Sequence, residues 1–404
     1  MKYDVFFSLS QTPVDGHTPS EAQMFRNTLR QVQAADELGY GTAWFAESHL
    51  SSQVQKSNPD PVIPHWEGEV GLNCNVLQMA SHVFARTKNI EVGSAVMNIV
   101  CMGGPIAWAE RIASFVALHG LDEAESRRLH VGFSGGRFQF MNRETGIKPR
   151  NAVEEAAWPA LRGQVFAEAA EVFIRLLNGE VLSSEQVTPT VLTRANFRSD
   201  ADWGRVQDAA GGRPGSISIP NRWDFLPLEI VPRAWRRELV QLIIGSHDPG
   251  LQQRVNALAP VQVFNLSITS PDKIEATHER MRACYGGRTD ERDAAAGIWQ
   301  RDFMPRTTFV FVDDSQEAAR ARAEKALSAY WKALTGTIDP QKIASAADNA
   351  LVGTPDQVAE QAASRFHPQD RLMLWFDFFD HDCDRVIRGM QQWTEEVAPQ
   401  LAGA

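Results

Sequence analysis

The sequence predicts an α/β fold: a (β/α)8 TIM barrel formed by one domain over residues 1–404. Two observations lead to this prediction. Eight short, almost continuously apolar segments recur along the chain, as is typical of parallel strands buried on both faces. All but the fourth are followed closely by a helical pattern, and eight strands with outer helices are the count of this barrel. The chain exceeds the barrel's usual size of about 250 residues, so we expect insertions after strands 2, 4 and 7.

The first half of the chain is expected to hold four strands. Residues 51–73 interrupt the pattern, because their prolines and glycines disfavour regular structure, and a long ordered loop of this kind often forms a lid or a substrate wall. The elements expected are strands at 5–9, 42–46, 90–97 and 129–134, and helices at 20–38, 74–85 and 105–119.

The second half begins with a helix at 154–177 and then changes character. Residues 179–232 are polar and rich in turn residues, so we expect an insertion with a β-hairpin and a mobile loop. The alternation then resumes. The elements expected are strands at 240–245, 261–266, 307–312 and 371–376, and helices at 249–258, 271–285, 316–334, 355–366 and 383–397.

Composition narrows the class of partner. A formal net charge of −10 and a pI near 5.5 argue against nucleic acid, so a small-molecule substrate is expected. Four distant cysteines suggest neither a disulfide framework nor a zinc site, which favours a cytoplasmic protein. No run of about 18 apolar residues indicates a membrane span. The segment His381–Asp384 precedes a helix and fits a helix cap better than a metal site, so no metal is expected.

In such a barrel the active site lies at the carboxyl ends of the strands. Glu47, Ser48 and His49 follow the second strand there, and His49 fits either an acid–base group or a satisfied rim residue, with Glu47 on the opposite face if the strand continues. Gly245–Pro249 fits a phosphate site at a helix start, or simply a helix cap. Trp375 and Asp377 are the corresponding positions at the carboxyl end of the last strand.

Residues 132–137 form a second glycine-rich turn after a strand. The spacing is wrong for a dinucleotide fingerprint, and no acidic residue follows at the end of a next strand. The turn fits a close backbone approach to a planar cofactor, whereas Arg137 alone could be a solvated loop cation.

Four motifs in the same order resemble those of the bacterial luciferase-like flavin-dependent monooxygenases. They span Ala35–Leu50, Ala85–Val96, Pro105–Gly136 and Gly353–Val358. The resemblance covers nearly the whole chain and implies the same barrel.

The resemblance also implies a chemistry. Such proteins bind reduced FMN from a separate flavin reductase, add O2 to form a C4a-(hydro)peroxyflavin, and oxygenate a small organic substrate; homodimers are common. A non-prolyl cis peptide at Ala95–Val96 would shape the flavin bed. The cofactor-binding residues expected are Ala95, Val96, Asn98, Ser134, Gly135, Gly136, Arg137, Gly245, Ser246 and His247.

The chain departs from the family pattern at the expected catalytic group of Glu47, Ser48 and His49. Ser48 stands where the family has its first histidine, so light emission is not expected; Ser48 can hydrogen-bond but cannot act as a base near pH 7. The family's phosphate-contacting arginine aligns nearer Gly135, and Arg137 is expected to replace it. The substrate pocket is expected to contain His17, Trp66, Glu67, Phe138, Asn265 and Trp375.

Two alternatives stay open at this point. The same barrel serves deazaflavin-dependent oxidoreductases, which move a hydride without oxygen. Related barrels also bind flavin without turnover, although a storage protein has no need of Trp66 or of the long loop that begins at Ser51.

Overall fold

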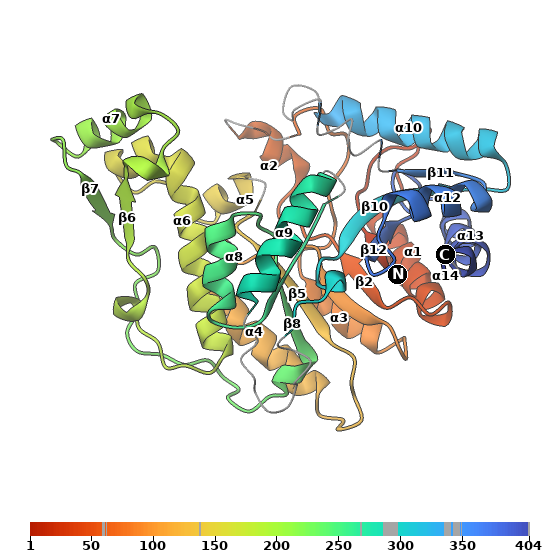
Figure 1. Ribbon diagram of the computed structural model, residues 1–404, viewed down its shortest axis with the longest axis horizontal. Coiled ribbons are helices and arrows are strands. Elements are labelled where there is room, and N and C mark those ends of the chain that lie inside the picture. Colours follow the sequence, from red (N-terminus) through yellow and green to blue (C-terminus); the bar gives the residue numbers. More distant parts are fainter. Residues whose placement is uncertain are drawn as a thin grey trace.

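A curled, all-parallel sheet surrounded by helices forms the body of the protein (Figure 1). The computed structural model describes residues 1–58, 61, 63–136, 139–266, 269–285, 298–334, 341, 348 and 350–402. The nine strands of the main path pair in the order β11-β10-β12-β1-β2-β3-β5-β8-β9, and β4 pairs with β5. Their bounds are β1 Lys2–Phe7, β2 Thr42–Phe45, β3 Glu91–Ser94, β4 Met97–Asn98, β5 Leu129–Ser134, β8 Val240–Ile244, β9 Val261–Val263, β10 Arg306–Val312, β11 Leu351–Gly353 and β12 Arg371–Trp375.

All eight predicted strands are present and pair in parallel. The curl brings the end of the path at β9 towards β10. Asn265 forms a parallel bridge with Arg306, and its backbone N–H donates to the Pro305 carbonyl at 3.0 Å. The Thr307 N–H in turn donates to the Asn265 carbonyl at 3.2 Å. This curvature is the one expected of a barrel, because each strand of a twisted parallel sheet is rotated against the next.

The helices lie on the outside of the sheet and bury their apolar faces against it (Figure 1). Most begin and end within three residues of the predicted bounds. Those around the sheet are α1 Glu21–Glu37, α3 Val76–Phe84, α4 Gly104–His119, α5 Gln139–Glu144, α6 Ala152–Leu177, α8 Pro249–Asn256, α9 Pro271–Cys284, α10 Gln316–Leu334, α12 Pro355–Arg365, α13 Cys383–Gln392 and α14 Ala398–Ala402, with a π-helical turn at Trp393–Val397 between the last two.

The expectation that residues 51–73 contain no regular structure is wrong at one point. Helix α2 spans Ser52–Ser57. The prolines of this segment begin only at residue 59, so nothing upstream of them prevents a helical turn. The Ser52 N–H donates to the Glu69 carboxylate at 2.7 Å, which anchors the start of the helix to the far end of the same segment.

The segment at 179–232 contains a small antiparallel sheet of β6 (Thr190–Thr193) and β7 (Ser216–Ile219). The two strands and helix α7 (Asp200–Ala209) project beyond α6 on the side opposite the chain termini (Figure 1). The stretch expected to be a loop therefore includes a helix. Ser199 caps this helix by accepting from the Asp202 N–H at 3.1 Å. The mobility of the segment stays a prediction.

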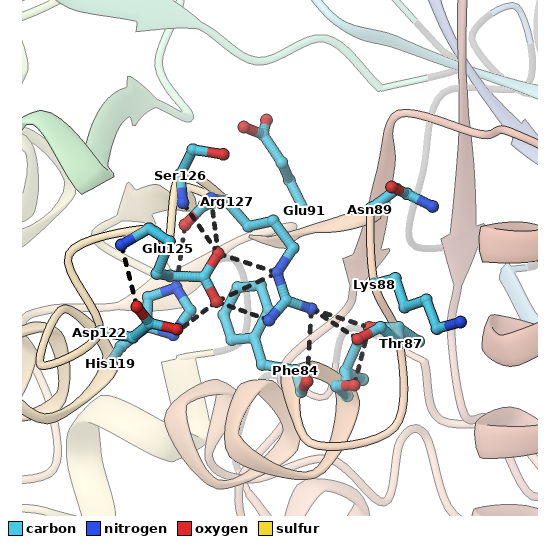
Figure 2. Close-up of polar contacts among 12 residues, drawn as sticks. Phe84, Thr87, Lys88, Asn89, Glu91, His119, Asp122, Glu125, Ser126 and Arg127 are labelled. Carbon is cyan, nitrogen blue, oxygen red and sulfur yellow. Dashed lines mark hydrogen bonds and ion pairs between the residues drawn. The ribbon is translucent and has the colours of Figure 1, made fainter.

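At the amino-terminal edge of the sheet, Arg127 joins the loop before β5 to the turn before β3. Figure 2 shows its guanidinium between the Glu125 carboxylate and the carbonyls of Phe84 and Thr87. Nη2 donates to Glu125 Oε2 at 2.5 Å, and Nη1 donates to the Thr87 carbonyl at 2.9 Å. The guanidinium also lies 4.8 Å from the centre of the Phe84 ring. Arg127 thus has a structural role here.

The same end of the sheet encloses a buried ion pair. Asp4 on β1 is fully buried and accepts from Trp44 Nε1 at 2.7 Å and from Arg371 Nε at 2.6 Å. Arg371 Nη2 donates to the Thr42 hydroxyl at 2.7 Å. A carboxylate and a guanidinium in this position are tolerated because each satisfies the other's hydrogen-bonding groups.

Replacing Asp4 with alanine should strongly destabilise the fold, since Arg371 would keep a buried charge without its partner. We expect the free energy of unfolding to fall by about 3–5 kcal/mol in urea denaturation. Lys2→Ala is the matched control on the same strand: Lys2 pairs with Asp302 at the surface, and such pairs contribute about 0–1 kcal/mol. Equal losses for the two variants would contradict this account.

Candidate active site

The carboxyl ends of the strands surround an apolar interior. Side chains alternate between two faces along each strand, so every second residue of this parallel sheet points inward. On β12, Met373 and Trp375 point inward whereas Leu372 and Leu374 pack against the helices. The inner cluster consists of Phe6, Trp44, Ile243, Phe264 and Met373, with Ala46, Ala95, Val96 and Trp375 packed against it.

Three strand ends meet around the peptide bond between Ala95 and Val96. This bond is cis, which confirms the position that the resemblance implied. A Cβ atom built on Gly245, at the end of β8, would lie 3.1 Å from Val96 Cγ2 and 3.3 Å from the Ser134 Cβ on β5. Glycine at 245 therefore leaves room at the point where β3, β5 and β8 come together. The structure thus brings these predicted cofactor residues into one place.

Asn98 and Gly136 form the next part of this surface. Gly136 has φ +80°, and a Cβ there would lie 2.2 Å from Asn98 Nδ2. Asn98 Nδ2 donates to Asn142 Oδ1 at 2.7 Å, and Asn142 Nδ2 donates to the Gly135 carbonyl at 2.8 Å. The short helix α5 thus holds the glycine turn in place through Asn142. Sequence reasoning missed Asn142, because no motif singles it out. We call Ala95, Val96, Asn98, Ser134, Gly136 and Gly245 the cradle.

The turn after β8 satisfies the capping interpretation. Asp248 Oδ1 accepts from the Leu251 N–H at 2.6 Å, and Pro249 is the first residue of α8. The Ser246 hydroxyl accepts from the Asp248 N–H at 3.2 Å. Asp248 therefore caps the helix.

His247, in the same turn, lies in positive surroundings. Its Nδ1 is buried and has no hydrogen-bond partner within the described part of the chain. Burial lowers the pKa of His247 to about 4, and the charges of Lys273 and Arg280 add to this effect. A neutral imidazole under the influence of two cations suits an anionic group of a ligand better than a cationic one.

Glu47 and His49 form a buried pair, and the expectation that they point to opposite faces is wrong. Residues two apart along a strand share a face, so continued alternation would itself have placed Glu47 beside His49; in the structure β2 ends at Phe45 and the two side chains still meet. His49 Nε2 lies 3.2 Å from Glu47 Oε1, and Glu47 Oε2 accepts from the Val76 N–H at 3.1 Å. An ionised carboxylate only accepts, so the proton is assigned to Nε2, and Nδ1 is left as the acceptor of the imidazole.

Ser48, between them, has a buried hydroxyl without a hydrogen-bond partner among the described residues. Its backbone N–H donates to the Asn73 carbonyl at 2.9 Å. Asn73 Nδ2 donates to the Ala46 carbonyl at 2.9 Å, so the end of the 51–73 segment fixes the backbone on both sides of Glu47.

The predicted substrate residues lie in different places. Trp66 is buried in the 51–73 segment, with its ring centre 5.7 Å from that of Phe379. Glu67 is exposed. His17 is exposed and lines a separate outer hollow of about 420 Å³ that is bordered by α1 and α13. The structure therefore does not bring His17 to the strand ends.

Asn265 is fully buried, and neither side-chain atom has a hydrogen-bond partner in the described part of the chain. Asn265 is the bridge partner of Arg306, so the two side chains lie on the same face of the sheet. Arg306 packs over the Phe366 ring on the outer face. Its role towards a substrate stays a prediction. Arg137 and Phe138, also predicted site residues, lie outside the described residues.

On the inner face of β12, Trp375 is followed by Asp377, to which sequence reasoning assigned no role. Burial raises the pKa of Asp377 to about 7, and the nearby charge of Asp380 adds to the effect. A signal was present in the sequence, since Asp377 has the inward parity of Trp375. What the sequence could not show is that, among the described residues, no cation pairs with this carboxylate.

Within the described residues, no cluster of three or more histidine, cysteine or acidic side chains could hold a metal ion. The capping interpretation of the His381–Asp384 segment is confirmed. Asp382 Oδ1 accepts from the Arg385 N–H at 3.0 Å at the start of α13, and His381 Nε2 lies 2.6 Å from the Thr12 carbonyl.

Comparison with known proteins identifies the family. Residues 1–368 match the model of the luciferase-like monooxygenases, and the chain belongs to that family. These proteins are oxidoreductases that act on small molecules. Across the described part of the chain, we find no helix with both the length and the apolarity to span a membrane.

Solved structures with the same fold include both flavin- and F420-dependent proteins. The monooxygenase RslO1 from Streptomyces bottropensis has a TM-score of 0.67 at 17% identity, over 99% of both chains. The oxygenating constituent of 3,6-diketocamphane monooxygenase from Pseudomonas putida, in complex with FMN, has a TM-score of 0.56 at 15% identity, over 99% of this chain and 98% of that one. An F420-dependent secondary alcohol dehydrogenase has a TM-score of 0.53 at 13% identity, over 99% and 98% respectively.

The cradle can be probed by a pair of glycine substitutions. Gly136→Ala should lower the free energy of unfolding by about 1–3 kcal/mol more than Gly146→Ala. Both positions have positive φ, +80° and +92°, but a Cβ at Gly146 meets nothing within 4 Å whereas one at Gly136 meets Asn98. The two variants share the conformational cost, so the difference in urea denaturation reports the contact alone. Identical values would show that Asn98 does not fill this space.

Proposed function

We propose that this protein is a flavin-dependent monooxygenase. It binds reduced FMN supplied by a separate flavin reductase and uses O2 to oxygenate a small organic substrate. The observation that carries the proposal is the cradle, where a cis peptide and two glycines leave a backbone-lined surface at the carboxyl ends of β3, β5 and β8. The two glycines let the strand ends approach one another, because a Cβ at Gly136 would meet Asn98 and one at Gly245 would meet Val96 and Ser134, and a planar ring could lie on the surface that these residues form.

The surroundings of His247 support an anionic tail on the ligand. The turn adjoins the cradle through Gly245, and Lys273 and Arg280 act on His247 electrostatically. An FMN molecule would place its ring on the cradle and its phosphate near this turn. When bound, the reduced flavin supplies the electrons that activate O2.

The chain's own residues would then transfer protons and exclude water. His49 is oriented by Glu47 through Nε2, so its Nδ1 is the atom that accepts or returns a proton. The unpartnered Ser48 hydroxyl offers a hydrogen bond to a ligand at the same strand end. Trp66 packs against Phe379, which follows β12, and would help to keep water from the reacting groups.

A deazaflavin-dependent oxidoreductase is the second candidate, and the F420-dependent structures of the same fold favour it. The cradle suits either ring system. The third candidate, flavin binding without turnover, is less well supported, because a carrier gains nothing from the buried Glu47–His49 pair.

Three further points belong to the proposal. The chain is expected to form a complete (β/α)8 barrel whose insertions follow strands 2, 4 and 7, that is β2, β5 and β10. A homodimer is expected by analogy with the family. The cytoplasm is the expected location, since the four cysteines are free.

Anaerobic titration with reduced FMN tests the cofactor. We expect saturable binding, and at least about tenfold weaker binding of reduced riboflavin, which lacks the phosphate that the His247 turn would hold. Admission of O2 should then consume oxygen in a reaction that candidate substrates accelerate. Binding of reduced F420 in place of FMN would replace the proposal with the deazaflavin alternative. Failure of both cofactors to bind would reject a flavin-type enzyme altogether.

His49→Ala should lower turnover by tenfold or more and leave the affinity for reduced FMN nearly unchanged, because His49 is expected to move a proton rather than hold the ring. His82→Ala, at a surface position in the last turn of α3, is the matched control and should behave like the wild type. An unchanged rate for His49→Ala would remove this residue from the mechanism.

A further inference from the structure

The inner face of β12 ends in a wall of aromatic rings. The ring centre of Trp375 lies 4.5 Å from that of Phe6, 5.0 Å from that of Phe309 and 4.8 Å from that of Phe378. Trp375 also belongs to the inner cluster that contains Ala95 and Val96, so this wall and the cradle border the same interior. A ligand lying between them would meet mainly carbon on the β12 side.

Asp377 is the acidic residue that follows this wall on the same face. Its Oδ1 is buried and has no hydrogen-bond partner among the described residues, and the same holds for the indole Nε1 of Trp375. The indole N–H lies near enough to lower the pKa of Asp377 in part, but not in hydrogen-bonding geometry. An ionised carboxylate is costly in this position, because within the described part of the chain no cation pairs with it and Oδ1 has no donor.

The charged groups that the structure describes at this end of the sheet do not supply that compensation. Asp380 accepts two hydrogen bonds from Arg385, and its negative charge disfavours a second negative charge on Asp377. In two other pairs the charged groups already contact each other: Asp313 with Arg322, and Glu47 with His49. The neutral carboxylic acid is therefore the form of Asp377 that this environment favours, and a neutral acid has an O–H to donate.

We propose that Asp377, as a neutral carboxylic acid, donates a hydrogen bond to the carbonyl oxygen of an apolar ketone or aldehyde, and so selects this class of substrate. The inference rests on the proposed function and deepens it. Trp375 is a positioning residue: its ring forms the wall beside Asp377, and its indole partly stabilises the ionised carboxylate and so helps to set the pH at which the donor is lost. The aromatic wall fits an apolar body, and a single donor fits one acceptor oxygen. A cationic amine would instead need a carboxylate, which the neutral acid does not offer.

The proposal has a definite pH dependence. The donor exists below the pKa of about 7 and is lost above it, so the protonated fraction falls roughly tenfold between about pH 6 and pH 8. Affinity for a ketone should fall by about the same factor over that range. Affinity for a hydrocarbon of the same shape should not change.

The test uses the full-length protein and ligand-observed NMR, with cyclohexanone and 2-heptanone as probes and cyclohexane and heptane as their hydrocarbon counterparts. Asp377→Asn keeps an N–H donor but cannot ionise, so ketone binding should persist and become independent of pH. Asp377→Leu removes the donor, and the preference for ketone over hydrocarbon should drop about tenfold at pH 6. Trp375→Phe should move the midpoint of the pH profile upward, since the indole no longer lowers the pKa.

Asp313→Asn is the matched control: a carboxylate at the end of the neighbouring strand β10 that is already paired with Arg322. It should reproduce the wild-type profile. Near-ultraviolet circular dichroism and reduced-FMN titration of each variant verify that the fold and the cradle are intact.

The inference is overturned if Asp377→Asn retains the wild-type pH dependence, if Asp377→Leu keeps the ketone preference, or if the wild type binds neither ketone better than its hydrocarbon. If reduced FMN binds normally in those cases, only the assignment of Asp377 fails. If the wild-type protein does not bind reduced FMN, the proposed function fails instead, and ketone selectivity is decided separately by the same variants.

Discussion

The organisation of this protein depends on one constraint: each strand of the curled parallel sheet is buried on both faces. One face meets the outer helices and the other meets the interior, so a residue's parity along the strand decides which environment it enters. Along β1, Asp4 and Phe6 enter the interior, whereas Val5 and Phe7 pack beneath the helices. A shift of one residue would exchange these environments and leave Asp4 without its partner.

The interior changes in character from one end to the other. At the amino-terminal end it contains the ion pair of Asp4 and Arg371, which makes polar contacts with Trp44 and Thr42. The middle consists of large apolar side chains. At the carboxyl end, by contrast, polar atoms such as Ser48 Oγ and Asp377 Oδ1 have no partner among the described residues. The satisfied ion pair at one end stabilises the fold, and the unpartnered Ser48 Oγ and Asp377 Oδ1 at the other remain available to a ligand.

Much of the fold could be predicted from the sequence, because apolar runs and helical stripes are local patterns. All eight strands are present, and the cis peptide lies at Ala95–Val96 as the family motif implied. The errors occurred where local pattern and long-range contact disagree. Helix α2 forms in a segment rich in proline because Glu69 anchors its first turn. The contact between His49 and Glu47 is a different kind of error, because residues two apart in an extended chain share a face and the local pattern already favoured it.

The sequence by itself determined the order of strands and helices, the family, and the set of residues that follow each strand. All of these depend on residues that are close together in the chain. Only the tertiary structure decided which of those residues share an environment. His17 and Trp66 were equally plausible site residues in the sequence, yet one lines an outer hollow and the other is buried beside Phe379. Asp377 became a candidate only when its surroundings were known. Burial and charge compensation depend on groups far apart in the chain, and no local pattern records them.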